Sequence, residues 1–523
     1  MRPNSNHALA ALLVTLFAAG CGSTRYPGSS VASRAPMQPA YAYPAATAAA
    51  VAPMGVATEA ERPKSAEAYK DYGVNPLVDP QKDRFSTFSI DVDTASYAIS
   101  RRKIIEGGLP PYQAVRVEEF LNYFDYGYEA PQQGPFAVHL AAAPSPFAAG
   151  KHVLRVGLQA RRVAPKDRKP VHLVYLVDTS GSMESADKLG LAKKSLKLLT
   201  NTLGQGDTVA LCTYAGSTRE VLAPTGAERK GEIFAAIDDL TAGGSTAMES
   251  GIQIAYRLAG KTAVAGHVNR VVILSDGDAN VGATSHDDLL KTIRSYKEKG
   301  ITLSTVGFGQ GNYQDTTMEQ LADQGDGNYS YIDSETQAKR VFSEQVSGLL
   351  EVVARDVKIQ VEFDPAVVKQ YRLLGYENRD IADKDFRNDK VDAGEVGAGH
   401  SVTAVYEVIL ANTQSSPVTV RLRHKAPTGT EAAVESVFKM DPASISASFE
   451  AAPQSLRFAA GVAEFGEILR KSPHAAGVTF AEVEKIARAA AKDRQDQQEM
   501  LDLLHRADAL AGGKPLAMAQ AAQ

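Results

Sequence analysis

The sequence lacks an excess of basic residues and has almost no cysteine. Its 56 Lys and Arg residues are outnumbered by 61 Asp and Glu residues, and the formal net charge is -5. Proteins that neutralise nucleic-acid phosphates carry a basic excess, so this composition argues against nucleic acid as a partner. The ten histidines form no His-x-x-Glu-His cluster, and no Gly-x-Ser-x-Gly elbow occurs. Two common enzyme motifs, those of zinc proteases and of α/β-hydrolases, are therefore absent.

The two cysteines have separate expected roles. Cys212 lies in "DTVALCTYAG", an alternating apolar stretch that predicts a strand. We expect it to be a small buried side chain rather than a reactive thiol. Cys21 ends the N-terminal apolar run "ALAALLVTLFAAG", which is too short to span a bilayer and is typical of a secretory signal. No intramolecular disulfide is expected, so stability must come from packing.

The ending "AAGC" resembles the lipobox at which bacterial lipoproteins are cleaved and acylated on the cysteine. That resemblance implies a lipid anchor on Cys21, and Gly22 after it implies sorting to the outer membrane of a Gram-negative cell. Ala18 stands where the lipobox usually has leucine, so a plain signal peptide is the alternative. The following segment, to about Arg62, is rich in Ala, Pro and Ser, and we expect an extended tether. The expected location is the cell envelope.

A chain of 523 residues is too long for one core and predicts several domains. The pattern changes along the chain from mixed strands and helices to regular alternation, then to strands, then to helices. The expected parts are a signal and lipobox over 1–21, a tether over 22–78, an N-terminal α/β module over 79–169, a doubly wound α/β domain over 170–353, a β-sandwich-like region over 354–450 and a helical C-terminal region over 451–523.

The α/β domain is predicted from strands that alternate with helices after Pro170. The run "VHLVYLV" is almost continuously apolar, which is typical of a strand buried on both faces of a parallel sheet. The segment "KLGLAKKSLKLLTNTL" has helical spacing, with its lysines expected on the outer face. Repeated alternation of this kind favours an open, doubly wound domain with a mostly parallel sheet.

Polar residues stand at three places where strands of this domain end or helices begin. They are Asp178, Ser180 and Ser182 in "VDTSGSM", Thr246 in "GGSTAM" and Asp276 in "ILSDGD". Taken singly, each group is explained by helix capping or a turn. Ligands of doubly wound domains bind at the carboxyl ends of the strands, where these groups would meet. Their hydroxyl and carboxylate oxygens are the hard ligands that Mg²⁺ prefers.

The pattern Asp178-x-Ser180-x-Ser182, then Thr246, then Asp276 resembles the metal-ion-dependent adhesion site of von Willebrand factor type A domains. The resemblance implies that Ser180, Ser182 and Thr246 bind the metal directly, and that the two aspartates act mainly through water. Mg²⁺ is the expected ion, with Mn²⁺ or Ca²⁺ as alternatives. An ion held by neutral hydroxyls favours an anionic further ligand, so the expected partner is a protein with an exposed Asp or Glu. The longer chain also resembles bacterial lipoproteins of unestablished role that carry this domain.

Two other functions remain open. In one, the metal only stabilises the domain as a scaffold of an envelope assembly, and other modules contact the partner. In the other, Asp91-x-Asp93 in "SIDVDTAS" resembles the nucleophile motif of Mg²⁺-dependent phosphatases of the haloacid-dehalogenase type. That family has Thr or Val two residues after the second Asp, where this chain has Ala95. We therefore expect an Asp-rich turn there, and no enzyme.

Overall fold

A computed structural model describes residues 67–245, 247–277, 283–309, 313–427 and 432–516. The chain divides into the units Met1–Arg62 and Pro63–Gln523. The predicted signal, the lipobox cysteine Cys21 and most of the tether lie outside the described residues. In the described ranges, no helix combines the length and apolar character that a membrane crossing requires.

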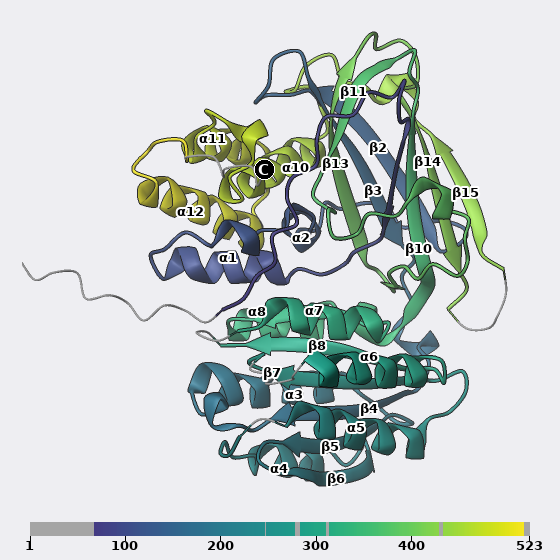
Figure 1. Ribbon diagram of the computed structural model, residues 1–523, viewed down its shortest axis with the longest axis vertical. Coiled ribbons are helices and arrows are strands. Elements are labelled where there is room, and N and C mark those ends of the chain that lie inside the picture. Colours follow the sequence, from purple (N-terminus) through teal and green to yellow (C-terminus); the bar gives the residue numbers. More distant parts are fainter. Residues whose placement is uncertain (1–66, 246, 278–282, 310–312, 428–431, 517–523) are drawn as a thin grey trace, which may run out of the picture. The chain divides into compact units, whose positions relative to one another are not determined.

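The middle of the chain forms a six-stranded sheet in the order β6-β5-β4-β7-β8-β9 (Figure 1). Its neighbours run parallel except for the antiparallel pair β5 and β6. This confirms the predicted doubly wound, mostly parallel α/β domain. Its strands are β4 (Val171–Asp178), β5 (Thr208–Tyr214), β6 (Thr218–Gly226), β7 (Val268–Ser275), β8 (Ile301–Phe308) and β9 (Tyr329–Ile332). Its helices are α3 (Leu191–Thr202), α4 (Lys230–Asp238), α5 (Met248–Thr262), α6 (Ala283–Lys297), α7 (Asp315–Gln324), α8 (Glu335–Lys339) and α9 (Val346–Leu350).

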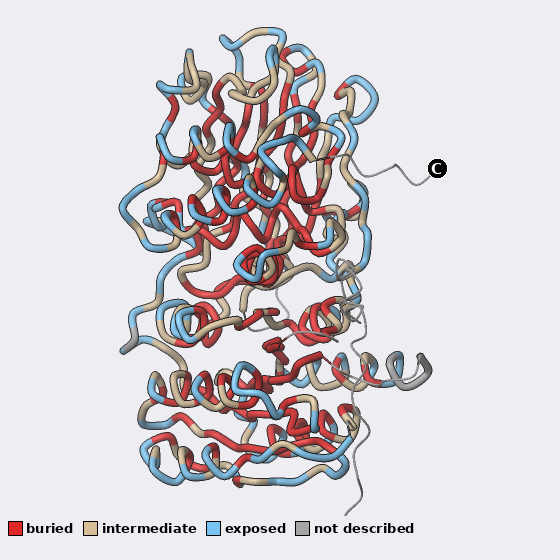
Figure 2. The backbone as a smooth tube through the Cα atoms, turned by 90° about the vertical axis from the view of Figure 1, so that its left-hand side faces the viewer, coloured by how far each residue is buried: buried red, intermediate tan, exposed pale blue. Residues whose placement is uncertain are grey.

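Strand β4 is buried along its whole length, as its apolar run predicts. Successive side chains point to opposite faces of the sheet. Leu173 and Tyr175 therefore join the core that contains α3, while Val174 and Leu176 join the core that contains α5. In Figure 2, the tube is red along the strands of the domain, which marks their residues as buried. Helices on both faces thus fix the position at which β4 ends, in Asp178.

Two further sheets share a core of their own. One has the order β1-β10-β14-β15 with β12 paired to β10, and the other has the order β11-β13-β3-β2. Strands from before the α/β domain pair with strands from after it, since β1 is antiparallel to β10 and β3 to β13. These strands are β1 (Phe85–Ser89), β2 (Phe136–Pro144), β3 (His152–Ala160), β10 (Val352–Phe363), β11 (Val368–Leu374), β12 (Val396–Gly397), β13 (Ser401–Leu410), β14 (Val418–Lys425) and β15 (Val434–Lys439). The segments 79–169 and 354–450 therefore build these sheets jointly.

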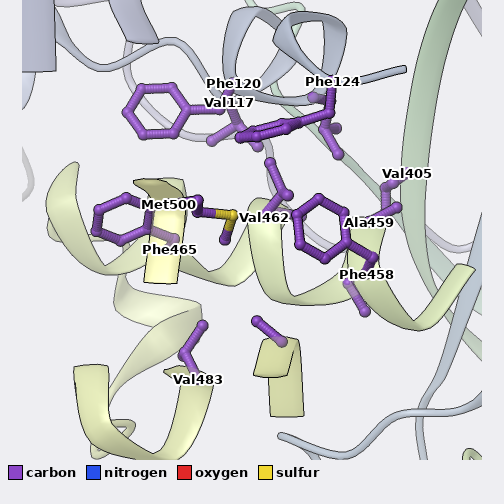
Figure 3. Packing of buried hydrophobic residues seen from close by; sticks show 14 of the residues in the cluster. Val117, Phe120, Phe124, Val405, Phe458, Ala459, Val462, Phe465, Val483 and Met500 are labelled. Atoms are coloured by element: carbon purple, nitrogen blue, oxygen red, sulfur yellow. The ribbon is translucent and has the colours of Figure 1, made fainter. Parts of the chain in front are cut away.

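The C-terminal helices pack against a helix from the start of the chain. Helices α10 (Gln454–Leu469), α11 (Phe480–Ala490) and α12 (Gln495–Leu510) share an apolar core with α2 (Val117–Tyr123) and α1 (Ala95–Ile105). In Figure 3, Phe120 of α2 lies edge-on to Phe465 of α10, with ring centroids 5.8 Å apart. Phe124 meets Phe458 in the same manner at 5.3 Å. Edge-to-face rings are a favourable aromatic geometry, so these contacts help to join α2 and the residue after it to α10.

Buried ion pairs fasten the N-terminal helices to the α/β domain. The Nη2 atom of Arg101 in α1 lies 2.5 Å from Oδ1 of Asp333. The Nη1 atom of Arg116, just before α2, lies 2.5 Å from Oδ2 of Asp315 at the start of α7. All four side chains are almost fully buried, so the α/β domain packs tightly against its neighbours in the same unit.

Candidate metal-ion site

The predicted site residues gather where the order of the central sheet reverses. Strand β4 has β5 on one side and β7 on the other, and ligands of doubly wound sheets bind at such a point. Asp178 ends β4, Ser180 and Ser182 follow at once, and Asp276 follows the last residue of β7. The structure thus places these four residues in two adjacent loops.

The loop before α5 is tied to the loop after β4. The amide of Gly181 donates to the carbonyl of Gly244 at 3.0 Å, and the amide of Gly243 donates to the carbonyl of Thr179 at 2.7 Å. Gly244 has a φ of +92°, and a Cβ atom there would lie 2.9 Å from the amide nitrogen of Gly216. The glycine at position 244 thus allows this close approach to Gly216. The predicted ligand Thr246 lies outside the described residues.

Asp178 is buried and held through both carboxylate oxygens. The amide of Ser180 donates to Oδ1 at 2.9 Å, and the hydroxyl of Ser275 donates to Oδ2 at 2.9 Å. Burial raises the pKa of Asp178, although these hydrogen bonds act in the opposite direction. Ser275 was not among the predicted residues. Its signal was its place directly before Asp276 in "ILSDGD".

The oxygen atoms of this site suit a hard divalent cation. The Oγ atoms of Ser180 and Ser182 lie 3.0 Å apart. Strands β4 and β7 are paired, and Ser275, the residue before Asp276, donates its hydroxyl hydrogen to Asp178. Within the described ranges, no three His, Cys, Asp or Glu side chains gather as a metal site would require. The candidate donors are hydroxyl and carboxylate oxygens, and these together with water fit Mg²⁺.

A lysine that the sequence did not point to lies against this site. The Nζ atom of Lys188 is 2.9 Å from Oδ2 of Asp276, and both side chains are buried, at 11% and 1% exposure. The prediction that the lysines of this segment face outward is wrong for Lys188, although Lys194 is 60% exposed as expected. Helix α3 begins only at Leu191, and the preceding turn Ala186–Gly190 is a wider π-helical one. The regular helical spacing that predicted an outward side chain therefore does not extend to Lys188.

The acidic pair of the phosphatase alternative is engaged in structural contacts. The Oδ1 atom of Asp91 accepts a hydrogen bond from the amide of Asp93, and Oδ1 of Asp93 accepts one from the amide of Tyr329 in β9. Both carboxylates face the guanidinium of Arg379, at 3.5 and 3.4 Å. Burial raises the pKa of Asp93 well above its usual range, and the charge of Asp91 acts in the same direction. The pair thus joins this segment to the α/β domain.

Three family models match successive parts of the chain. The model for the von Willebrand factor type A domain matches residues 172–344, one described as von Willebrand factor matches 63–155, and one described as the C-terminal part of the uncharacterized protein YfbK matches 348–510. The match to residues 172–344 covers the doubly wound domain, including the loops at the ends of β4 and β7 that carry the candidate site. Type A domains mediate protein–protein interactions, and many bind a divalent cation at such loops.

Individual proteins resemble most or part of the chain as well. The uncharacterized protein YfbK of Escherichia coli (strain K12) is 36% identical over 482 residues, which are 86% of this chain and 83% of that protein. The uncharacterized protein sll0103 of Synechocystis is 26% identical over 233 residues, 44% of this chain and 54% of that one. A solved structure, the von Willebrand factor type A protein from Catenulispora acidiphila, has a TM-score of 0.44 at 16% identity over 72% of this chain and 91% of that one.

Proposed function

Because the chain belongs to the family of the Escherichia coli protein YfbK and carries a von Willebrand factor type A domain, we propose that it binds a protein partner through a divalent cation at the edge of this domain. Ser180, Ser182 and Thr246 would hold Mg²⁺, or Mn²⁺ or Ca²⁺ in its place, while Asp178 and Asp276 act mainly through water. When bound, the cation supplies positive charge at an open position, which suits a carboxylate of the partner's Asp or Glu.

The observation that carries this proposal is the pair of hydroxyls beside a buried carboxylate. Ser180 and Ser182 place their Oγ atoms 3.0 Å apart. Asp178 accepts hydrogen bonds from the amide of Ser180 and the hydroxyl of Ser275, so its carboxylate is fixed in position. Neutral hydroxyls leave the charge of a divalent cation only partly balanced. The residues of this chain thus orient the oxygens and preserve the attraction for an anionic partner.

We expect Asp178→Ala to weaken Mg²⁺ binding at least about tenfold, as is usual when an outer-shell partner of a metal site is lost. Isothermal titration calorimetry on the purified protein would measure this affinity. The same variant should fail to retain envelope proteins that the wild type captures in Mg²⁺ and releases in EDTA. Asp239→Ala is the matched control, since Asp239 is exposed at the end of α4 and should behave as the wild type.

A scaffold function is the second candidate, and the buried ion pairs of Arg101 and Arg116 favour it. They join the α/β domain firmly to its neighbours, so a cation in the loops would stabilise a larger unit whose other surfaces contact the partner. The experiment above separates the two functions. A partner retained by Asp178→Ala after metal affinity is lost would exclude the adhesion function and leave the scaffold.

We also propose that Cys21 carries a lipid anchor in the cell envelope, in the outer membrane facing the periplasm or the cell surface. The support is the "AAGC" ending and the Ala- and Pro-rich segment after it. Mass spectrometry of the mature N-terminus should find an acylated cysteine, and Cys21→Ser should lose the acyl mass and leave the membrane fraction. A mature wild-type protein whose N-terminus is unacylated would exclude the anchor.

A further inference from the structure

Lys188 brings a fixed positive charge to the candidate metal site. Its Nζ atom lies 2.9 Å from Oδ2 of Asp276, and the ammonium and carboxylate are both largely removed from solvent. Because the pair is buried, its effective dielectric constant is lower than that of bulk water, and the attraction is several times stronger than it would be in water at the same distance. Asp276 is also one of the two carboxylates that the proposed cation would use. The carboxylate that pairs with the Lys188 ammonium would therefore also face the cation, mainly through water.

The fold holds Lys188 in this position from the other side. Gly309, after β8, has a φ of +70°, and a Cβ atom there would overlap Cγ, Cδ and Cε of the Lys188 side chain. The carbonyl of Gly309 accepts hydrogen bonds from Nη1 of Arg102 in α1, at 2.6 Å, and from the hydroxyl of Tyr331. The backbone that supports the lysine stem is thus fixed by α1 and by β9. The surrounding fold therefore determines the position of the Lys188 side chain, which is not an ordinary surface side chain.

We propose that Lys188 is a resident counter-ion that sets the affinity of this site for divalent cations. In the metal-free protein its ammonium is a close partner of the buried Asp276 carboxylate. A divalent cation must displace that ammonium from the carboxylate or bind against its repulsion, and either course weakens metal binding. The inference rests on the proposed function and adds its regulation, because the site then fills only where divalent cations are abundant.

The test compares Lys188→Met with the wild type by calorimetric titration with Mg²⁺ and with Mn²⁺ alone. We expect the variant to bind both ions at least about tenfold more tightly, because a like charge is removed and the carboxylate is released. In EDTA the variant should melt at a lower temperature than the wild type, and saturating Mg²⁺ should raise its melting temperature by more. Lys194→Met, which removes an exposed lysine paired with exposed Glu335, should leave both quantities unchanged.

A second variant guards against misfolding. Lys188→Gln keeps a hydrogen-bond donor near Asp276 without the charge, and it should also tighten metal binding. Equal or weaker metal affinity of folded Lys188→Met and Lys188→Gln, beside a wild type that binds, would overturn the inference and leave the proposed function intact. If both variants bind a metal ion and the wild type does not, the inference is supported most strongly. If none of the three proteins binds either ion, the proposed function fails and the inference with it.

Discussion

The Arg379→Met variant is expected to lose about 3–5 kcal/mol of unfolding free energy, the usual cost of removing one partner from a buried ion pair. Arg379 lies between β11 and β12, and its side chain is only 10% exposed. Its Nη1 atom is 2.7 Å from Asp323, and its Nη2 atom is 3.3 Å from Glu319. It also faces Asp91 and Asp93. Methionine would fill similar space but leave these carboxylates without a common cation.

The loss of unfolding free energy in Arg379→Met should depend on pH, because the carboxylates that no longer face a guanidinium can take up protons. Burial raises the pKa of Glu319 to about 6 even with Arg116 and Arg379 beside it, and it raises the pKa of Asp93 as well. Without Arg379 these groups would protonate at still higher pH, which removes part of the buried charge. We therefore expect the difference from the wild type to be smaller near about pH 5 than near pH 8.

Urea titrations followed by circular dichroism at both pH values would measure these free energies. Arg387→Met is the matched control, since Arg387 is 63% exposed and pairs with Glu435 across the surface. Exposed pairs contribute about 0–1 kcal/mol, so the control should stay close to the wild type. A loss for Arg379→Met no larger than that of the control would show that the carboxylates around it are not held as a buried group.

Sequence periodicity was sufficient for the class of the α/β domain, because its buried strands carry their own signal, although the more exposed edge strand β6 was not predicted. The apolar run of β4 reports burial on both faces without reference to any other segment. The pairing of β1 with β10 and of β3 with β13 was not predictable in the same way. Alternation within a strand shows that one face is buried, but it does not say which distant strand lies beside it. The segment before the α/β domain could therefore be described only as a module.

The candidate site likewise contains residues that the sequence predicts and one that only the tertiary structure reveals. Asp178, Ser180 and Ser182 are close in sequence, and the strand before them fixes where they lie, so their grouping with Asp276 could be inferred. Lys188 could not, because its burial depends on a π-helical turn and on the space above Gly309. The Gly309 carbonyl is held by Arg102 of α1 and Tyr331 of β9, which are distant in sequence from the lysine, so no periodic pattern near Lys188 reports these contacts.

Two glutamates one turn apart on α10 should respond to neutralisation in opposite directions. Burial alone would raise the pKa of Glu467, but Arg470 and Arg372 lower it to about 2. Their nearest guanidinium nitrogens lie 3.1 and 2.8 Å from its carboxylate oxygens. Burial raises the pKa of Glu464 to about 8, and the charges of Glu467 and Glu407 act in the same direction. The Oε1 atom of Glu464 is buried and makes no hydrogen bond with any described residue.

The signs follow from proton binding. Glu467 is ionised in the folded protein below its ordinary pKa of 4.5, so its contribution is complete above that pH and disappears as the pH falls toward about 2. The Glu467→Gln variant should therefore lose about 3 kcal/mol of unfolding free energy near neutral pH and progressively less in acid. Glu464 keeps a proton that the unfolded chain releases above 4.5, so it destabilises the protein increasingly as the pH rises toward about 8. Glu464→Gln removes this destabilisation. Its free energy of unfolding should therefore be about 2 kcal/mol higher than that of the wild type near pH 7 and little changed near pH 4.

Thermal unfolding of both variants and the wild type from about pH 4 to pH 8 would check this pair of predictions. The two substitutions are chemically identical and lie on one helix, so helix propensity and side-chain size cancel between them. Only the surrounding charges differ, because Glu467 has two guanidinium groups and Glu464 lies beside other carboxylates. If both variants shifted stability in the same direction at every pH, the ion pairs of Glu467 would not be what holds α10 against β11. Opposite shifts that diverge as the pH rises would show that Arg372 in β11 and Arg470 after α10 stabilise this junction through charge.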